Sequence, residues 1–174
     1  MTSVVISRLT SPTSDTLDFT GLSLSGYRVV TLAVWGLTPG TDDARPQLRV
    51  SQSSSFISGA SDYAYANQAT STNGTGDGDS SGATTAIWLA NNTANFGVGN
   101  AAGESFAARI EIVNRESGEP FYCTYNCAAT GPSSAGIMTN GSGRVNNSTA
   151  IDGLRILMSA GTMPTGKAVL IGHT

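Results

Sequence analysis

The stretch that decides the fold is Tyr27-Arg-Val-Val-Thr-Leu-Ala-Val-Trp-Gly36, a run of β-branched and aromatic residues. Such side chains fit the pleated surface of a β-strand. The Leu-Thr-Pro-Gly segment that follows, residues 37–40, contains the proline and glycine that end a strand in a turn. The run therefore predicts a central strand.

Shorter runs of the same kind recur along the chain and are separated by turn-forming residues. Within residues 108–114, Ile110 and Ile112 fall on one face of the predicted strand. Arg109 and Glu111 fall on the other face, which is the period of two expected of a sheet with one wet side. These patterns predict strands at residues 4–9, 16–19, 47–52, 61–67, 85–90, 107–114, 120–128, 154–159 and 168–172.

Helix signals are scarce. The best, residues 101–108, lacks an apolar repeat of three or four and predicts one turn at most. About ten short strands without helical crossovers predict an all-β fold, a two-sheet antiparallel β-sandwich or jelly roll with long polar loops. We expect one domain over residues 1–174, with an N-terminal arm or edge strands at 1–24 and the sandwich at 25–172.

Two segments without large apolar residues, 67–83 and 129–149, are expected to be long exposed loops. The hydrophobic core is expected to be built from large side chains on the predicted strands. These are Tyr27, Val29, Trp35, Trp88, Phe106, Ile110, Ile112, Ile156 and Leu170.

The charge pattern argues against several partners. Only 12% of the residues are charged, the formal net charge is −3, and no basic stripe is present, so nucleic acid is not an expected partner. No apolar run is long enough to span a bilayer, and residues 1–9 lack the features of a secretory signal. We therefore expect no membrane insertion and synthesis in the cytoplasm.

Cys123 and Cys127 are predicted to be thiols in the core. Four residues of extended chain hold them about 13 Å apart, which exceeds the ~7 Å between bridged Cα atoms. The single histidine, His173, lies far away in sequence, so neither a metal site nor a cofactor is expected.

Catalytic patterns are also weak. Ser80 and Ser81 in Gly-Asp-Ser-Ser-Gly (78–82) would need a base, and His173, expected to be mobile near the chain end, is the only histidine. We expect no enzyme. Asp77 and Asp79 could supply oxygen ligands to calcium from a glycine-rich loop, but a solvated loop making occasional contacts is favoured.

Four tyrosines are candidates for stacking on sugar rings. Tyr63 and Tyr65 form one pair, and Tyr122 and Tyr125 form another, each expected to lie on one face of a strand. Filling the core is the competing interpretation for all four.

Four segments of the chain form a distinctive set. They are Leu48-Arg-Val-Ser51, Ser58-Gly-Ala-Ser-Asp-Tyr-Ala-Tyr65, Ala108-Arg-Ile-Glu-Ile112 and the closing segment Ile151-Asp-Gly-Leu-Arg-Ile-Leu-Met-Ser-Ala-Gly-Thr-Met-Pro-Thr-Gly-Lys-Ala-Val-Leu-Ile-Gly172. Together they resemble a jelly-roll module common in tailed bacteriophages, prophages and gene-transfer particles. Two features depart from that module: its usual aromatic near the end is Ile171 here, and the strand with Cys123 and Cys127 is not part of its pattern.

The resemblance implies a phage virion structural protein on the particle surface. It would be a head decoration (cement) protein or a compact fibre or spike subunit that contacts itself and other virion proteins. Three-fold or higher symmetry is common in such particles. The alternative is a lectin-like adhesin module that binds a host surface glycan.

Overall fold

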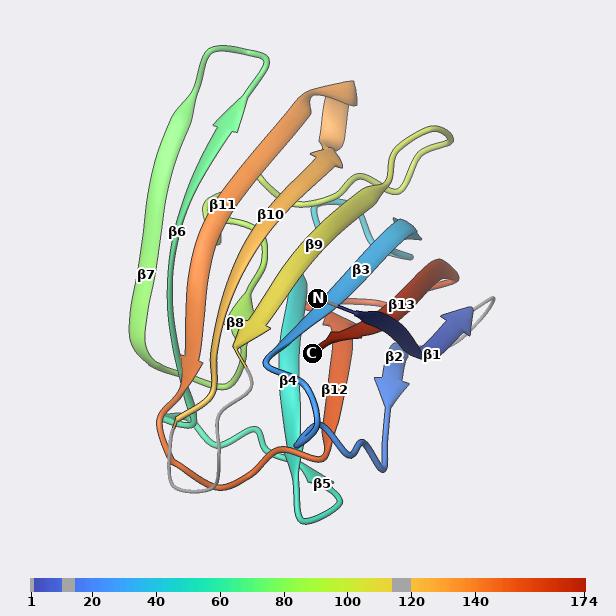
Figure 1. Cartoon of the computed structure of the whole chain (residues 1–174). Helices are drawn as coiled ribbons and strands as arrows, with labels where there is room; N and C mark the ends of the chain where they lie inside the picture. Colours follow the sequence, from blue (N-terminus) through green and yellow to red (C-terminus); the bar gives the residue numbers. More distant parts are fainter. Residues whose placement is uncertain (1, 11–14, 114–119) are drawn as a thin grey trace.

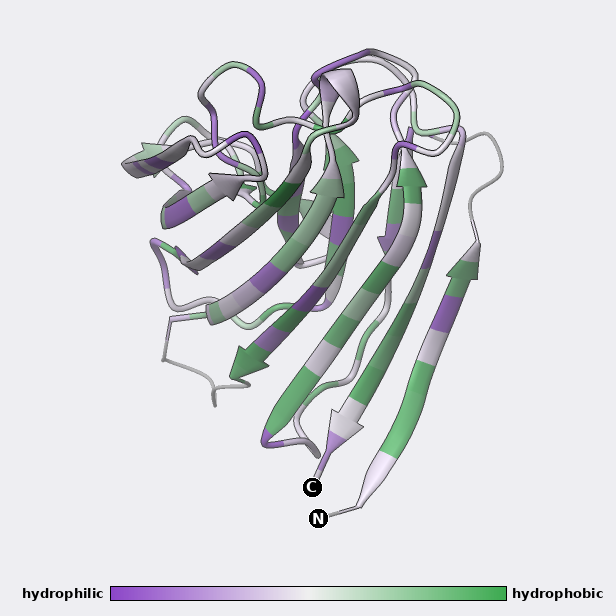
Figure 2. Ribbon diagram, turned by 90° about the horizontal axis from the view of Figure 1, so that it is seen from above, coloured by the Kyte–Doolittle hydropathy of each residue, from purple (hydrophilic) through white to green (hydrophobic). Residues whose placement is uncertain are grey.

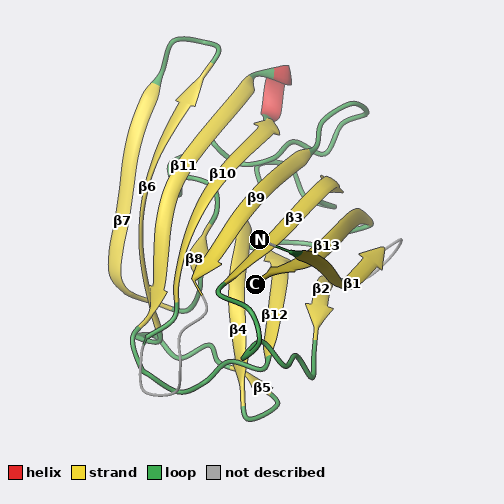
Figure 3. Cartoon of the chain, viewed as in Figure 1, coloured by secondary structure: helices red, strands yellow, loops and turns green. Residues whose placement is uncertain are grey.

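The computed structural model describes residues 2–10, 15–113 and 120–174. Two antiparallel sheets pack face to face, so the expected all-β sandwich is confirmed (Figure 1). The described part contains one short 3-10 turn, Pro132–Ser134, and otherwise consists of strands, turns and loops (Figure 3). None of its helical segments has the length or apolar character to cross a membrane.

The larger sheet has eight strands. In spatial order they are β1 (Ser3–Thr10), β13 (Thr165–His173), β3 (Val29–Thr38), β9 (Phe106–Val113), β10 (Tyr122–Thr130), β11 (Gly136–Val145), β6 (Tyr63–Ser71) and β7 (Gly76–Thr84). The smaller sheet has five strands. They are β2 (Thr16–Phe19), β12 (Gly153–Met158), β4 (Pro46–Gln52), β5 (Ser55–Phe56) and β8 (Ile87–Trp88), with β5 and β8 both pairing with β4.

Eight of these strands pair in a nested order. β1 pairs with β13, β2 with β12, β3 with β9, and β4 with β8. Two further pairs, β6 with β7 and β10 with β11, extend the large sheet beyond β9. The nesting brings the two chain ends together, and the backbone N–H of Thr174 donates to the oxygen of Thr2 at 3.1 Å.

The long run at residues 27–36 does become a central strand, β3, between β13 and β9. The alternation predicted in β9 is confirmed: Ile110 and Ile112 are buried, and Arg109 and Glu111 face solvent. Phe106, Ile156 and Leu170 are also in the core. Tyr27, Val29 and Trp88 are only partly buried.

The prediction for Trp35 is wrong, because its side chain is 42% exposed. Val30, Leu32 and Val34 occupy the inward positions of β3, so Trp35 takes the outward position beside Lys167. A run of apolar residues hides which face is the core, and alternation assigns Trp35 to the solvent side.

The two segments expected to be long loops are instead largely strands. Residues 67–83 form most of the β6–β7 hairpin, and residues 129–149 include β11. β7 is an edge strand with partly or fully exposed side chains, so it needs no large apolar residue. In both segments the local sequence favours a loop only weakly, and pairing with strands that are distant in sequence makes them strands instead.

Two glycines of β11 explain why so polar a segment can lie in the sheet. Gly141 and Gly143 face the interior, where other side chains use the room that they leave. A Cβ added at Gly143 would lie 2.5 Å from a methyl carbon of Ile87, and one at Gly141 would meet the hydroxyl oxygen of Tyr125. Glycine is therefore needed here for close packing between the sheets.

Both cysteines are unpaired and buried, as predicted. Cys123 and Cys127 alternate with exposed residues along β10 and so lie on its inward face. Burial raises the pKa of the Cys123 thiol to about 12 and raises that of Cys127 as well. Both therefore behave as small apolar core residues at neutral pH.

Candidate functional site

The outward face of β10, β11 and β6 carries a shallow hollow of about 280 Å³. Cross-strand register explains its position. Tyr122 on β10 lies opposite Arg144 on β11, and Arg144 lies opposite Ala64 on β6. Two residues further along, Thr124, Ser142 and Ala66 form the next row. The small side chains of that part of β6 and β11 leave space beside the two large ones.

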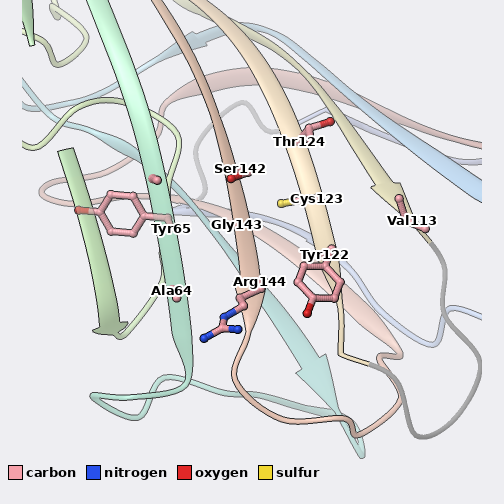
Figure 4. A pocket seen from close by; sticks show the side chains of 10 residues that line it. Ala64, Tyr65, Val113, Tyr122, Cys123, Thr124, Ser142, Gly143 and Arg144 are labelled. Carbon is pink, nitrogen blue, oxygen red and sulfur yellow. The ribbon is translucent and has the colours of Figure 1, made fainter. Parts of the chain in front are cut away.

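Figure 4 shows how the hollow is built. Tyr122 and Arg144 project from neighbouring strands, and Thr124 and Ser142 follow on the same strands. The methyl groups of Ala64 and Ala66 supply an apolar floor. The result is an open surface with one aromatic ring, one guanidinium and two hydroxyls.

Arg144 differs from three other arginines of the chain. Arg45, Arg109 and Arg155 pair with Asp43, Glu111 and Asp18, at N to O distances of 3.1, 3.0 and 2.5 Å. For Arg144, no acidic group among residues 2–10, 15–113 and 120–174 lies within ion-pair distance. Its guanidinium is exposed and can therefore accept an anionic partner from outside.

Of the four tyrosines proposed for sugar stacking, only Tyr122 faces solvent, with 39% of its surface exposed. The expectation that Tyr122 and Tyr125 share a face is wrong, because residues three apart on a strand point to opposite faces. Tyr125 is buried, and its hydroxyl donates to the backbone oxygen of Trp88 at 2.7 Å. Burial raises the pKa of Tyr125.

Tyr63 and Tyr65 do share a face, but it is the inward one. The Tyr63 hydroxyl accepts from the Val50 N–H at 2.9 Å and donates to the Ile57 oxygen at 3.0 Å. Burial raises the pKa of Tyr63 to about 12. Tyr63 and Tyr125 bond to the small sheet and its adjoining loop, and Tyr65 bonds to Asp79 on the neighbouring strand β7. All three rings therefore have structural contacts and are not exposed for stacking on a sugar.

Asp77 and Asp79 lie on β7 rather than in a loop. Asp79 accepts from the Tyr65 hydroxyl at 2.7 Å and from the Asn92 N–H at 3.1 Å, and Asp77 accepts from the Thr93 hydroxyl. Burial, and after it the bond to Asp79, raises the pKa of Tyr65. The described residues contain no cluster of three or more metal-ligating side chains. Both carboxylates hold the segment after β8 against β7.

His173 is ordered in β13, contrary to the expectation of a mobile end. Its ring nitrogens Nδ1 and Nε2 each lie 2.9 Å from a hydroxyl, Ser3 Oγ and Thr31 Oγ1. Because those residues belong to β1 and β3, the ring bridges the strands on either side of its own. No carboxylate in the described part of the chain bonds to it, so a Ser-His-acid arrangement is not formed there.

The other half of the same sheet face carries exposed apolar side chains on β1, β13 and β3, with Val5 at 44% and Trp35 at 42% exposure. Figure 2 shows much of these strands in the hydrophobic colour, next to the N and C labels. We call this surface the apolar patch. It consists of Val5, Val29, Ala33, Trp35, Val169 and Ile171.

Sequence reasoning missed Arg144 and misplaced Trp35. The alternation in Gly141-Ser-Gly-Arg-Val145 indicates a strand with Arg144 outward, but its glycines favour a loop when the segment is considered alone. Fold and surface together define a two-sheet antiparallel β-sandwich with a hollow and an apolar patch on one sheet face. Comparison with protein-family models, curated proteins and solved structures gives no match.

Proposed function

We propose that this chain is a non-catalytic structural protein that assembles with further copies of itself on the surface of a phage or phage-like particle. The apolar patch is the observation that carries the proposal. Val5 and Trp35 are exposed and Val29, Val169 and Ile171 partly exposed on one sheet face, and such a group of apolar side chains is typical of a protein interface. The resemblance to phage jelly-roll modules supplies the setting.

Charge favours a second copy as the partner. Arg8 and Lys167 are exposed within the patch and have no ion-pair partner in the described residues. The same chain carries an acidic end with three further carboxylates, Asp42, Asp77 and Asp79, around residues 92–100, where a fourth, Asp43, already pairs with Arg45. A head-to-tail contact between patch and acidic end would pair these charges, and such contacts close into rings when the rotation allows.

The nested strand pairing supports the jelly-roll part of the proposal. Pairing first with last, second with second last, and so on winds a two-stranded ribbon into two facing sheets, the plan of a jelly roll. β6–β7 and β10–β11 would then be hairpins inserted into that plan. Both lie on the side of the sheet that carries the hollow.

Light scattering coupled to gel filtration tests the assembly. The expected result is a mass several times 17.8 kDa that falls to the monomer in Val5→Asp or Trp35→Asp. Met138→Asp is the matched control, because Met138 is 55% exposed on the same sheet outside the patch. A monomer at all concentrations contradicts the proposal. Mass spectrometry of purified phage or phage-like particles tests whether the chain is part of them. Its absence from intact particles would rule out the proposed location on their surface.

The second candidate function, a lectin-like module, is favoured by a different observation, the hollow beside Tyr122 and Arg144. An exposed aromatic ring flanked by hydroxyls and an arginine suits a sugar ring. Binding of the purified protein to a glycan array, lost in Tyr122→Ala, is the test. Retained binding in that variant would place the sugar elsewhere.

A further inference from the structure

We propose that the Tyr122–Arg144 hollow binds a sugar that carries an acidic group, such as a uronic acid. The inference rests on the second candidate function, sugar binding, and adds the chemical class of the ligand. It does not depend on assembly through the apolar patch.

The acidic group follows from Arg144. This side chain is exposed at the rim of the hollow and lacks an acidic partner in the described residues, unlike Arg45, Arg109 and Arg155. A guanidinium presents paired N–H donors that match the two oxygens of a carboxylate. An arginine placed beside a hollow therefore selects an anion over a neutral group.

The sugar ring follows from the rest of the lining. Tyr122 offers an aromatic ring, and Ala64 and Ala66 offer methyl groups, which suit the C–H faces of a pyranose. Thr124 and Ser142 add hydroxyls that can donate and accept. At about 280 Å³ the hollow is at the small end of ligand sites, the size of a short saccharide.

Other anionic ligands fit less well. Nucleic acid needs several cations along a track, whereas among the described residues Arg144 is the one cationic side chain that lines the hollow. A peptide strand would need an open sheet edge, but β11 is paired on both sides, with β10 and β6. An acidic saccharide uses every group that the hollow presents.

The test is titration followed by ¹H–¹⁵N NMR with matched probes. Methyl glucuronide and methyl galacturonide are compared with methyl glucoside and methyl galactoside, which differ from them only in the carboxylate. We expect at least one acidic sugar to bind tenfold or more tightly than its neutral counterpart, with shifts at residues 122–124 and 142–144. Sodium chloride should weaken that preference.

Three variants make the test specific. Arg144→Gln should remove the preference for the acidic sugar and leave the neutral affinity within about twofold. Tyr122→Ala should weaken both sugars to a similar extent. Arg109→Gln, which changes an exposed arginine of the same sheet face that lies outside the hollow and pairs with Glu111, should bind like the parent.

The outcomes separate the two claims. Equal affinity for acidic and neutral sugars overturns the acidic class but leaves sugar binding intact, whereas no binding of any probe overturns both. Inorganic sulfate binding as tightly as the uronides would show a simple anion site and would also overturn the proposal.

Discussion

The hydroxyl of Tyr125 donates a 2.7 Å hydrogen bond to the backbone oxygen of Trp88, so a side chain of the large sheet is bonded to the main chain of the small one. The contact is partly buried, and the Asn67 amide donates to the same oxygen at a longer 3.4 Å. An acceptor shielded from water that loses its better donor is costly. The pair therefore fixes how the sheets sit against each other near the hollow.

Tyr125→Phe is expected to lower the free energy of unfolding by about 1–2 kcal/mol, because the Trp88 oxygen keeps only its weak bond to Asn67. Urea unfolding monitored by fluorescence measures the change. Ser142→Ala is the control, since Ser142 is exposed on the outer face of β11, and its effect should stay within about 0.5 kcal/mol. Equal losses in the two variants would contradict the assigned role.

Gly143→Ala is expected to destabilise the fold by about 1–3 kcal/mol, because the new methyl group would overlap Ile87 in a packed interior. Adding Ile87→Val should recover part of the loss, which a double-mutant cycle would measure. Gly82→Ala provides the matched comparison, because open space surrounds Gly82. A Gly143→Ala protein as stable as Gly82→Ala would refute the packing argument.

Asp79→Ala is expected to lower the free energy of unfolding by about 1–3 kcal/mol, because it leaves the partly buried Tyr65 hydroxyl without its acceptor. Thermal unfolding with and without calcium chloride separates this role from metal binding. If Asp79 is structural, calcium shifts the melting temperature of neither protein. A calcium-dependent rise in the parent alone would restore the metal interpretation.

Stability is expected to fall as the pH rises above about 8.5, the ordinary pKa of a thiol. Burial raises the pKa of Cys123 to about 12 in the fold. The unfolded chain therefore releases protons that the folded chain retains, and the free energy of unfolding decreases with pH. Below about pH 8 the thiols are largely protonated in both the folded and the unfolded chain, so their contribution to the free energy of unfolding is constant.

Urea unfolding at pH 7.5 and 9.5, with reductant present, measures this slope. The two buried thiols together should lower the free energy of unfolding by about 1–3 kcal/mol over that interval. A Cys123→Ala, Cys127→Ala double variant is less stable at both pH values but should show a smaller decrease. If the double variant loses as much unfolding free energy between the two pH values as the parent does, the thiols are not the cause of the loss.

The general plan was predictable where alternation was regular. Ile110 and Ile112 against Arg109 and Glu111 gave the correct faces, because one period-two stretch settles which side is buried. Likewise, Cys123 and Cys127 were correctly placed in the core as thiols. Such features depend on neighbours in the chain and can be inferred locally.

The candidate site depends on distant neighbours and was only partly predictable. Tyr122 was named, but Arg144 was not, because the Gly-Ser-Gly before it is typical of a loop when considered alone. Those glycines suit a strand only because Tyr125 and Ile87 fill the space above them. A row of residues drawn from three strands emerges only from the register between them.

The pairing of the first strand with the last also governs when the molecule can fold. Among the described residues β1 pairs only with β13, and β3 lacks one of its two neighbours until β13 is in place. During synthesis, residues 3–10 must therefore wait for residues 165–173 before any partner strand exists for them. Pairing between strands so far apart in sequence makes folding slow. Until residues 165–173 have been synthesised, the valines of β1 have no partner strand and can take part in aggregation.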